Sequence, residues 1–459
     1  MTSASAYPAY RQPKMRWLPA VPEHWNEQRA KTFFREVDER SRTGQEELLS
    51  VSHLTGVTPR SQKNVTMFKA ASYVGSKLCQ PGDIVINTLW AWMAALGASR
   101  HTGIVSPAYG VYRPHRAGSF NPTYLDYLLR TRAYTAEYIG RSTGIRASRL
   151  RLYPNQFLDI ALLQPPRPEQ DQIVAYLRAQ DAHIARFIKA KRELIKLLTE
   201  QKLRIIDHAV TRGLDASVAL KPSGIEWLGD VPGHWELRRL KFLASNTTNQ
   251  TTTKASDEIY LALEHVQSWT GVARPLEGEV EFASTVKRFV ADDVLFGKLR
   301  PYLAKVTRAR SAGVCVSEFL VLRSRKELIL PAYLEQLLRC KRVVDLINSS
   351  TAGAKMPRAD WNFIGNVRLP IPRQDEQEAI LSHILCETKD LDEAIARAED
   401  EIKLIREYRD RLIADAVTGQ VDLRGWQPGP DDAVSDDDLA ALDDDEAEPA
   451  EEDADGEEN

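Results

Sequence analysis

Two short glycine-centred segments carry side chains that could bind a polyanion. Residues 141–151 hold four arginines and no acidic residue, and residues 351–358 place Lys and Arg just after a glycine. Glycine lets the backbone approach a phosphate closely, and Arg or Lys can neutralise phosphates or bind guanine in the major groove. The alternative is a solvated basic turn, but the recurrence of the segment favours DNA contact. The candidate side chains are Arg141, Arg146, Arg149, Arg151, Lys355 and Arg358.

A further basic stretch differs between two matching places in the chain. Residues 298–310 hold five basic residues and no acidic one, whereas residues 88–100 hold Trp90, Trp92 and a single basic residue, Arg100. We therefore add Lys298, Arg300 and Lys305 to the candidate DNA-binding residues.

These stretches match because the sequence contains an internal tandem duplication. The motif WLxxVPxHW occurs at 17–25 and again at 227–235, an offset of 210 residues, and later matches follow in the same order at offsets of 207 to 210. A period this long excludes a solenoid, whose repeats run to roughly 20–50 residues. The chain is therefore interpreted as two copies of a whole domain, each followed by a connector.

Each connector is predicted to be a long helix that begins after a proline-rich stop. The helices are expected at 169–211 and 376–418, on the order of 65 Å each at ~1.5 Å per residue. Their apolar residues alternate in steps of 3 and 4, which predicts a heptad seam and an intramolecular coiled coil; packing of the stripe on the globular domains is the alternative. The seam residues are Ile184, Ile188, Ile195, Leu198, Ile205, Leu391, Ile395, Ile402, Ile405 and Leu412, with interruptions at Lys191, Lys202, Ala398 and Arg409.

Composition excludes several other classes of protein. The chain has 459 residues, 27% of them charged, and no apolar run near the ~20 residues of a membrane-spanning helix. Its four cysteines stand far apart without a CxxC pair, which argues against a disulfide framework and a cysteine-based zinc site. With no apolar stretch of signal-peptide type at the N-terminus, we expect a cytoplasmic protein.

The charge is divided unequally along the chain. Residues 431–459 contain 16 acidic residues and no basic one, and without them the chain has 61 basic and 48 acidic residues, a net charge of +13. A basic body suggests a polyanionic partner. The tail has too few apolar residues to fold alone and is expected to be disordered. It either keeps the chain solvated or competes with nucleic acid for the basic surface.

Together these features resemble the specificity subunit of type I restriction-modification enzymes. The resemblance rests on WLxxVPxHW, the glycine-basic segment, the proline-rich stop that runs into Glu169-Gln170 and Glu376-Gln377, and the long helix after each, and it covers residues 15–426. It implies an α+β fold with two similar α/β target recognition domains joined by two long helices that form an antiparallel coiled coil with pseudo-twofold symmetry. The implied boundaries are 1–14 for an N-terminal extension, 15–168 and 214–375 for the recognition domains, 169–213 and 376–424 for the helices, and 425–459 for the tail.

The resemblance also implies partners and cofactors. Each domain would read one half of a bipartite, asymmetric site on double-stranded DNA, and the helices would set the spacer. Two methyltransferase subunits would bind the helical region, and two motor-nuclease subunits would join for restriction. No cofactor is expected on this chain; S-adenosylmethionine, ATP and Mg would belong to the partners.

No catalytic constellation is found in the chain itself. There is no GxxxxGK[ST] loop for ATP. Asn121-Pro-Thr-Tyr124 resembles the Asn-Pro-Pro-Tyr box of amino-methyltransferases, but its duplicate begins with Leu330, so a helix start is favoured. His24 and His234 recur within a Trp-rich motif, where a packed or capping histidine is expected rather than a base or ligand. Two rival hypotheses remain: a stand-alone adenine methyltransferase with a degenerate motif, and a coiled-coil adaptor protein.

Overall fold

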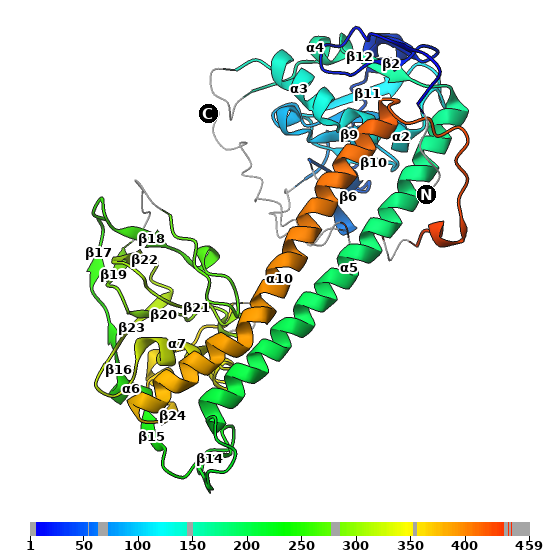
Figure 1. Cartoon of the computed structure of the whole chain (residues 1–459). Helices are drawn as coiled ribbons and strands as arrows, with labels where there is room; N and C mark the ends of the chain where they lie inside the picture. Colours follow the sequence, from blue (N-terminus) through cyan, green and yellow to red (C-terminus); the bar gives the residue numbers. More distant parts are fainter. Residues whose placement is uncertain are drawn as a thin grey trace. The chain divides into compact units, whose positions relative to one another are not determined.

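The chain divides into two compact units, each of which takes half of both long helices. The computed structural model describes residues 6–53, 55–62, 72–144, 150–276, 285–351, 356–435, 439 and 442. Unit 1 comprises Met1–Arg192 with Glu399–Asn459, and unit 2 comprises Glu193–Ala398. Figure 1 traces the chain through both units.

Unit 1 is built on a four-stranded antiparallel sheet in the order β4-β11-β8-β9. Two-stranded pairs β1-β2, β3-β12, β5-β6 and β7-β10 surround it, and short helices cover its core. The elements are β1 (Tyr10–Arg11), β2 (Val21–Pro22), β3 (Asn26–Arg29), α1 (Ala30–Phe33), β4 (Phe34–Glu36), β5 (Leu49–Ser52), β6 (Gly56–Pro59), β7 (Lys77–Cys79), β8 (Ile84–Ile86), β9 (Leu96–Ala98), β10 (Gly103–Val105), β11 (Gly110–Pro114), α2 (Pro122–Leu129), α3 (Arg132–Arg141), α4 (Pro154–Leu158) and β12 (Ala161–Gln164).

Unit 2 repeats this plan with a sheet in the order β16-β23-β20-β21. The matching strands pair in the same antiparallel sense, and β15-β24 and β13-β14 match β3-β12 and β1-β2. A second four-stranded sheet, β17-β19-β22-β18, is present in unit 2. The elements are β13 (Leu220–Pro222), β14 (Asp230–Pro232), β15 (Glu236–Arg239), α6 (Leu240–Leu243), β16 (Ala244–Thr247), β17 (Gln250–Thr251), β18 (Ile259–Leu261), β19 (Val286–Phe289), β20 (Val294–Gly297), β21 (Val306–Arg308), β22 (Gly313–Cys315), β23 (Phe319–Ser324), α7 (Pro331–Arg339), α8 (Lys341–Ser349), α9 (Trp361–Ile364) and β24 (Arg368–Ile371).

Each sheet holds the same buried ion pair. Asp83 accepts two hydrogen bonds from Arg113 in unit 1, at 3.1 and 3.0 Å, and Asp293 accepts two from Arg323 in unit 2, at 2.9 and 2.8 Å. Both aspartates are almost fully buried. A buried carboxylate needs such a partner because its desolvation is costly. The repeat of this pair, together with the shared strand order, supports the duplication inferred from the sequence.

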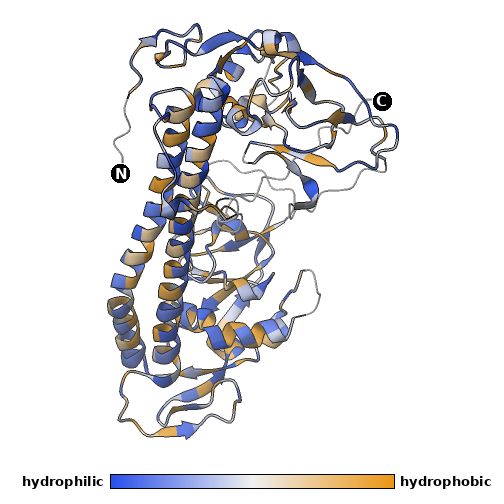
Figure 2. Cartoon of the chain, turned by 90° about the vertical axis from the view of Figure 1, so that its right-hand side faces the viewer, coloured by the Kyte–Doolittle hydropathy of each residue, from blue (hydrophilic) through white to orange (hydrophobic). Residues whose placement is uncertain are grey.

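The long helices are α5 (Arg167–Arg212) and α10 (Gln374–Val417), of 46 and 44 residues. Both begin two residues before the expected starts at 169 and 376, and α10 ends at Val417, one residue before the expected end at 418. Gly419 follows α10 with a φ of +76°, as Gly213 follows α5 with a φ of +75°, and this left-handed conformation ends a helix. Figure 2 shows apolar residues interspersed with polar ones along both helices.

The charged interruptions of the predicted seam form ion pairs between the two helices. In unit 1, Arg409 pairs with the buried Asp181, with its Nε 2.6 Å from Oδ1, and Lys191 pairs with Glu401. In unit 2, Lys202 pairs with Asp392. The seam is buried unevenly, because Ile188 is fully buried whereas Ile195 and Ile405 are half-buried.

The WLxxVPxHW motif joins the start of one long helix to the end of the other. In unit 1, the indole N–H of Trp25 donates to Glu169 at the start of α5, and a Cβ on Gly419, after α10, would lie 3.0 Å from the same ring. In unit 2, Trp235 donates to Glu376 at the start of α10, and a Cβ on Gly213, after α5, would lie 3.2 Å from it.

Residues near both ends belong to unit 1, which corrects the expected boundaries. In the expected extension 1–14, Tyr7 is buried and its hydroxyl donates to Glu169 at 3.2 Å. The described part of the tail, up to 435, lies on α5: Trp426 packs edge-on against Tyr176, with ring centroids 5.4 Å apart, and Asp432 pairs with His183 at 2.7 Å. The tail was predicted to be disordered because it has many acidic residues, and that prediction took no account of Trp426, which anchors the segment.

Candidate nucleic-acid interface

The described ends of the glycine-basic segment of unit 1 are joined by a short β-bridge. Thr143 and Arg151 exchange backbone hydrogen bonds of 3.1 and 3.0 Å, and Arg151 is exposed. Arg146 and Arg149 lie outside the described residues. The bridge therefore holds both ends of the segment in place at the surface.

Arg141 has a different environment from the one expected of a phosphate contact. Its Nε lies 2.5 Å from Glu137, one helical turn earlier on α3, and its Nη1 lies 3.7 Å from Asp159. These two carboxylates neutralise the guanidinium in the free chain. The sequence suggested a free arginine because the acidic residues lie outside the segment that was counted.

In unit 2, two separate stretches of candidate residues lie side by side. Leu299 and Arg358 form an antiparallel bridge, and the amide of Arg300 donates to the carbonyl of Pro357 at 2.8 Å. Arg300 is exposed, and the side chain of Arg358 is 59% exposed, with a guanidinium nitrogen 3.2 Å from Glu318. Lys355 lies outside the described residues. The structure thus brings Lys298, Arg300 and Arg358 to one surface.

Lys305 is used in the fold of unit 2. Its ammonium donates to the carbonyl of Leu263 at 2.7 Å, and burial lowers the pKa of the amine from its usual value. The ammonium keeps two further donors, and the role of Lys305 in DNA binding stays a prediction.

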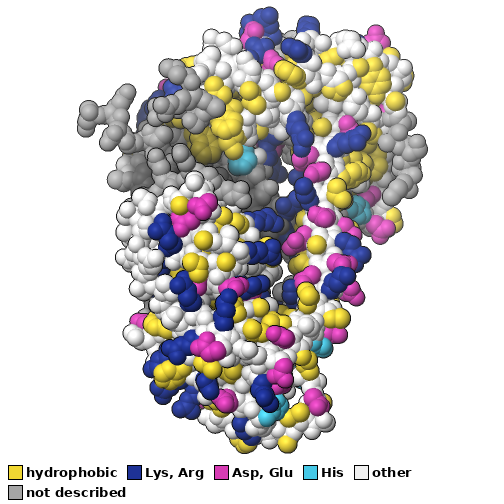
Figure 3. All heavy atoms as spheres, turned by 60° about the vertical axis from the view of Figure 1, so that its left-hand side comes forward, with side chains coloured by type: hydrophobic (Ala, Val, Ile, Leu, Met, Phe, Trp, Pro, Cys, Tyr) yellow, Lys and Arg dark blue, Asp and Glu magenta, His cyan; other side chains and the backbone are white. Residues whose placement is uncertain are grey.

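The charged surface is mixed. On the face drawn in Figure 3, Lys and Arg side chains form groups separated by Asp, Glu and apolar side chains. A mixed surface of this kind is suited to bind DNA through particular loops rather than along one continuous basic track. Exposed ion pairs already neutralise part of its positive charge.

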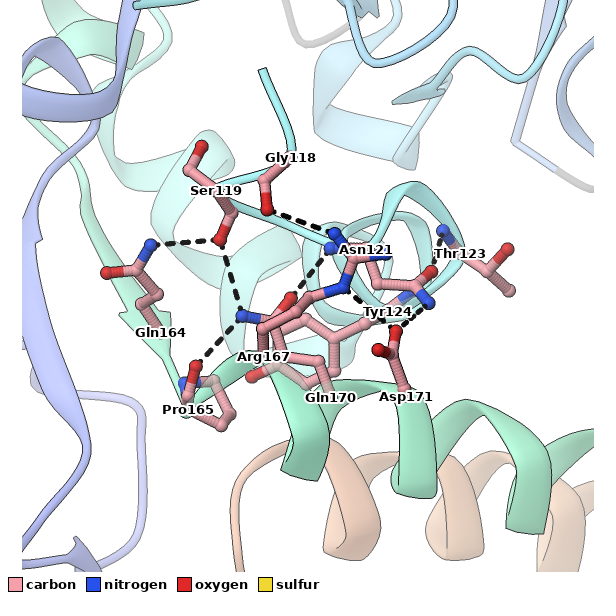
Figure 4. Close-up of polar contacts among 10 residues, drawn as sticks. All are labelled: Gly118, Ser119, Asn121, Thr123, Tyr124, Gln164, Pro165, Arg167, Gln170 and Asp171. Atoms are coloured by element: carbon pink, nitrogen blue, oxygen red, sulfur yellow. Dashed lines mark hydrogen bonds and ion pairs between the residues drawn. The ribbon is translucent and has the colours of Figure 1, made fainter. Parts of the chain in front are cut away.

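The segment that resembled a methyltransferase box is the start of a helix (Figure 4). The side-chain oxygen of Asn121 accepts the amide of Thr123 at 2.9 Å and so caps α2, and its amide nitrogen donates to Asp171 at 2.7 Å. Gln170 accepts the backbone amide of Asn121 at 2.7 Å. In unit 2, Gln377 accepts the amide of Leu330 at 2.8 Å in the same way. This agrees with the helix-start interpretation.

The recurring glutamate and histidines also have structural partners. His24 lies 2.7 Å from Glu169, and His234 lies 2.8 Å from Glu376. The sequence shows the Glu-Gln pair as a recurring motif, but not that both of its members hold the helix starts. Their recurrence at matching places was the available indication.

Reactive groups of other kinds are buried or scattered. Burial raises the pKa of the Cys79 and Cys315 thiols to about 12, which keeps them protonated and unreactive. Within the described ranges, His, Cys, Asp and Glu side chains form no group of three or more that could hold a metal ion. Among the same residues, no helix is both long enough and apolar enough to cross a membrane.

Comparison with known proteins agrees with the resemblance seen in the sequence. The chain is similar to the type I restriction enzyme EcoDI specificity subunit of Escherichia coli, with 22% identity over 218 residues, which are 47% of this chain and 48% of that protein. The match thus spans about half the length of this curated relative. The resemblance to type I specificity subunits is confirmed by it. No family model matches the chain.

Solved structures are similar in fold. A structure described for complex assembly and conformational transition of the type I R-M system has a TM-score of 0.54 and 14% identity, covering 87% of this chain and 99% of that one. The HsdS subunit from Thermoanaerobacter tengcongensis has a TM-score of 0.39 and 15% identity, covering 87% and 98%. At such identities only the fold is compared, and the first structure supports a shared mixed α/β fold.

Proposed function

We propose that this chain is the DNA sequence-recognition subunit of a type I restriction-modification complex. Each globular unit reads one half of a bipartite, asymmetric site on double-stranded DNA. The observation that carries the proposal is that the two units share one sheet topology while their basic surface loops differ in chemistry. Two domains with the same fold and different surface side chains are suited to bind two half-sites of different sequence.

The two long helices are proposed to pair as an antiparallel coiled coil with pseudo-twofold symmetry and to set the spacer. Support comes from each unit taken alone, because the start of one helix and the end of the other meet at the same tryptophan. The ion pairs Arg409–Asp181 and Lys202–Asp392 run in the same antiparallel order.

The proposed partners are two methyltransferase subunits and two motor-nuclease subunits. The helices carry apolar side chains suited to a protein partner: Leu385 is 73% exposed and Leu404 is 62% exposed. S-adenosylmethionine would be held by the methyltransferase subunits, and ATP and Mg by the motor subunits. The chain itself is proposed to be non-catalytic and to act in the cytoplasm.

Isothermal titration of the isolated chain with S-adenosylmethionine separates this proposal from a stand-alone methyltransferase. We expect no heat of binding for the isolated chain, and salt-sensitive, sequence-specific DNA binding once methyltransferase subunits are added. Cofactor binding by the chain alone would favour the enzyme. An absence of salt-sensitive DNA binding with and without partners would favour a coiled-coil adaptor.

A further inference from the structure

One loop in each unit shares part of its backbone hydrogen bonding with its counterpart and carries different side chains. Residues 87–95 join β8 to β9, and residues 297–305 join β20 to β21, at the offset of 210. The amide of Trp90 donates to the carbonyl of Asn87, whereas that of Arg300 donates to the carbonyl of Pro357, but three other hydrogen bonds repeat. The pairs are Asn87 N to Ala95 O at 3.0 Å and Gly297 N to Lys305 O at 2.9 Å; Met93 N to Trp90 O at 3.0 Å and Leu303 N to Arg300 O at 2.9 Å; and Ala94 N to Ala91 O and Ala304 N to Pro301 O, both at 2.8 Å.

Both loops keep a backbone conformation that side chains disfavour. Ala94 has a φ of +62° and Ala304 a φ of +47°, and Arg300 adds a third left-handed residue at +49°. Residues other than glycine seldom adopt this conformation, and it persists where the surrounding structure enforces it. The shape of the loop is therefore constrained in both units.

Each loop is also hydrogen-bonded to the residue that follows the glycine-basic segment of its own unit. The carbonyl of Thr88 accepts the amide of Leu152 at 2.9 Å, and the carbonyl of Lys298 accepts the amide of Ala359 at the same distance. The loop therefore lies next to the C-terminal end of the basic segment in each unit.

The side chains on this fixed loop diverge sharply. Thr88, Trp90, Ala91 and Trp92 of unit 1 correspond to Lys298, Arg300, Pro301 and Tyr302 of unit 2. Arg300 is exposed, Tyr302 is 43% exposed, and both tryptophans are half-buried. A loop that served packing alone would bury these side chains. Here partly exposed side chains of different chemistry lie on a turn that keeps the same left-handed conformation at its end, at Ala94 and Ala304.

We propose that this loop determines the base sequence each unit reads, with Arg300 and Tyr302 acting in unit 2 and Trp90 and Trp92 in unit 1. The inference rests on the proposed function and deepens it. An arginine can bind O6 and N7 of guanine in the major groove, and an aromatic ring can pack on a thymine methyl group. The half-site of unit 2 therefore contains a guanine read by Arg300, and the half-site of unit 1 is read at the same place by apolar contact.

The test is to sequence methylated bases in a host genome that carries the complete complex with single variants of this chain. Arg300→Gly removes the side chain but keeps the left-handed backbone. It should relax the guanine preference at one position of one half-site by roughly 10- to 100-fold. Tyr302→Ala should relax an adjacent position. The other half-site and the spacer should stay as in the unaltered complex.

Lys326→Ala is the matched control, because this lysine lies in the same unit with a side chain that is 66% exposed and its removal deletes the same charge. It should leave both half-sites unchanged. The transplant Trp90→Arg with Ala91→Pro and Trp92→Tyr should change only the half-site of unit 1.

Two results would overturn the inference. One is an unchanged motif in a complex with Arg300→Gly and Tyr302→Ala that methylates at the unaltered level. If those variants lose all methylation, the overturning result is a unit 1 half-site that the transplant leaves unchanged. If the unaltered chain specifies no bipartite motif, the proposed function itself fails, which is a separate outcome.

Discussion

Two tryptophans, Trp25 and Trp235, show how single residues fix the ends of the long helices. Each indole N–H donates to a glutamate at a helix start, at 3.0 and 2.9 Å, and the histidine before it contacts the same carboxylate. A hydrogen bond to a charged group stabilises a fold by about 1.5–3 kcal/mol. The motif is therefore a structural joint, which explains why it recurs in both copies without any catalytic role.

Replacing Glu376 with Gln should lower the free energy of unfolding by about 1.5–3 kcal/mol, because the bonds to Trp235 and His234 lose a charged acceptor. Denaturant unfolding of the full chain measures this. Glu378→Gln is the control, since Glu378 is exposed on the same helix turn. Equal stability of the two variants would contradict the role of the joint.

Adjacent aspartates in unit 2 offer a second test. Asp293→Asn should cost about 1.5–3 kcal/mol, because the buried side chain loses its charged hydrogen bonds to the partly exposed Arg323. Asp292→Asn should cost no more than about 1 kcal/mol, because Asp292 pairs with exposed Lys326 and Arg308. Thermal unfolding compares them. A similar loss for both would show that the Asp293 pair does not support the sheet.

Local patterns predicted part of the candidate interface. The composition of residues 298–310 identified Arg300, and the glycine-basic segment identified Arg358. Their adjacency depends on backbone pairing between residues nearly sixty positions apart, which no local pattern encodes. The bond of Lys305 to the carbonyl of Leu263 was not predicted for the same reason, because that carbonyl belongs to a distant turn.

At the scale of elements, the heptad pattern predicted both long helices to within two residues at their starts. It also identified the charged interruptions but not their partners. The structure pairs Lys191, Lys202 and Arg409 with acidic residues of the other helix. The periodicity reveals where a seam lies, but the partner of each charge depends on the direction of the opposing helix.

Exchanging one of these charges tests the helix pairing. Lys202→Glu should destabilise the chain by about 1 kcal/mol, because it places a carboxylate opposite Asp392. Adding Asp392→Lys should restore most of that loss. A double-mutant cycle by denaturant unfolding measures the coupling, and additive effects of the two changes would argue against pairing at this position.

The spacer hypothesis is tested by lengthening both helices together. One heptad inserted after Lys196 in α5 and one after Ala396 in α10 should extend each helix by about 10 Å. At 3.4 Å per base pair, the preferred spacer should grow by about three base pairs. Mapping the methylated motif of the altered complex measures this, and an unchanged spacer would contradict the proposal.

At the scale of the whole molecule, charge is separated between a basic body and an acidic C-terminus. Residues 426–433 bind along α5 through Trp426 and Asp432, and the chain beyond Ser435 adds 14 acidic residues and no basic one. A chain ended after Ser435 should bind non-specific DNA more tightly, because its net charge is more positive. Titration at several salt concentrations measures this, and unchanged affinity would favour a solvating role.

The account depends most on the claim that one duplicated chain reads two unlike half-sites. The direct measurement is sequencing of methylated adenines in a genome that expresses this chain with its methyltransferase subunits. The account predicts one motif of two different short sequences separated by a gap of fixed length, with methylation in both halves. A single uninterrupted motif, or methylation that does not depend on this chain, would contradict it.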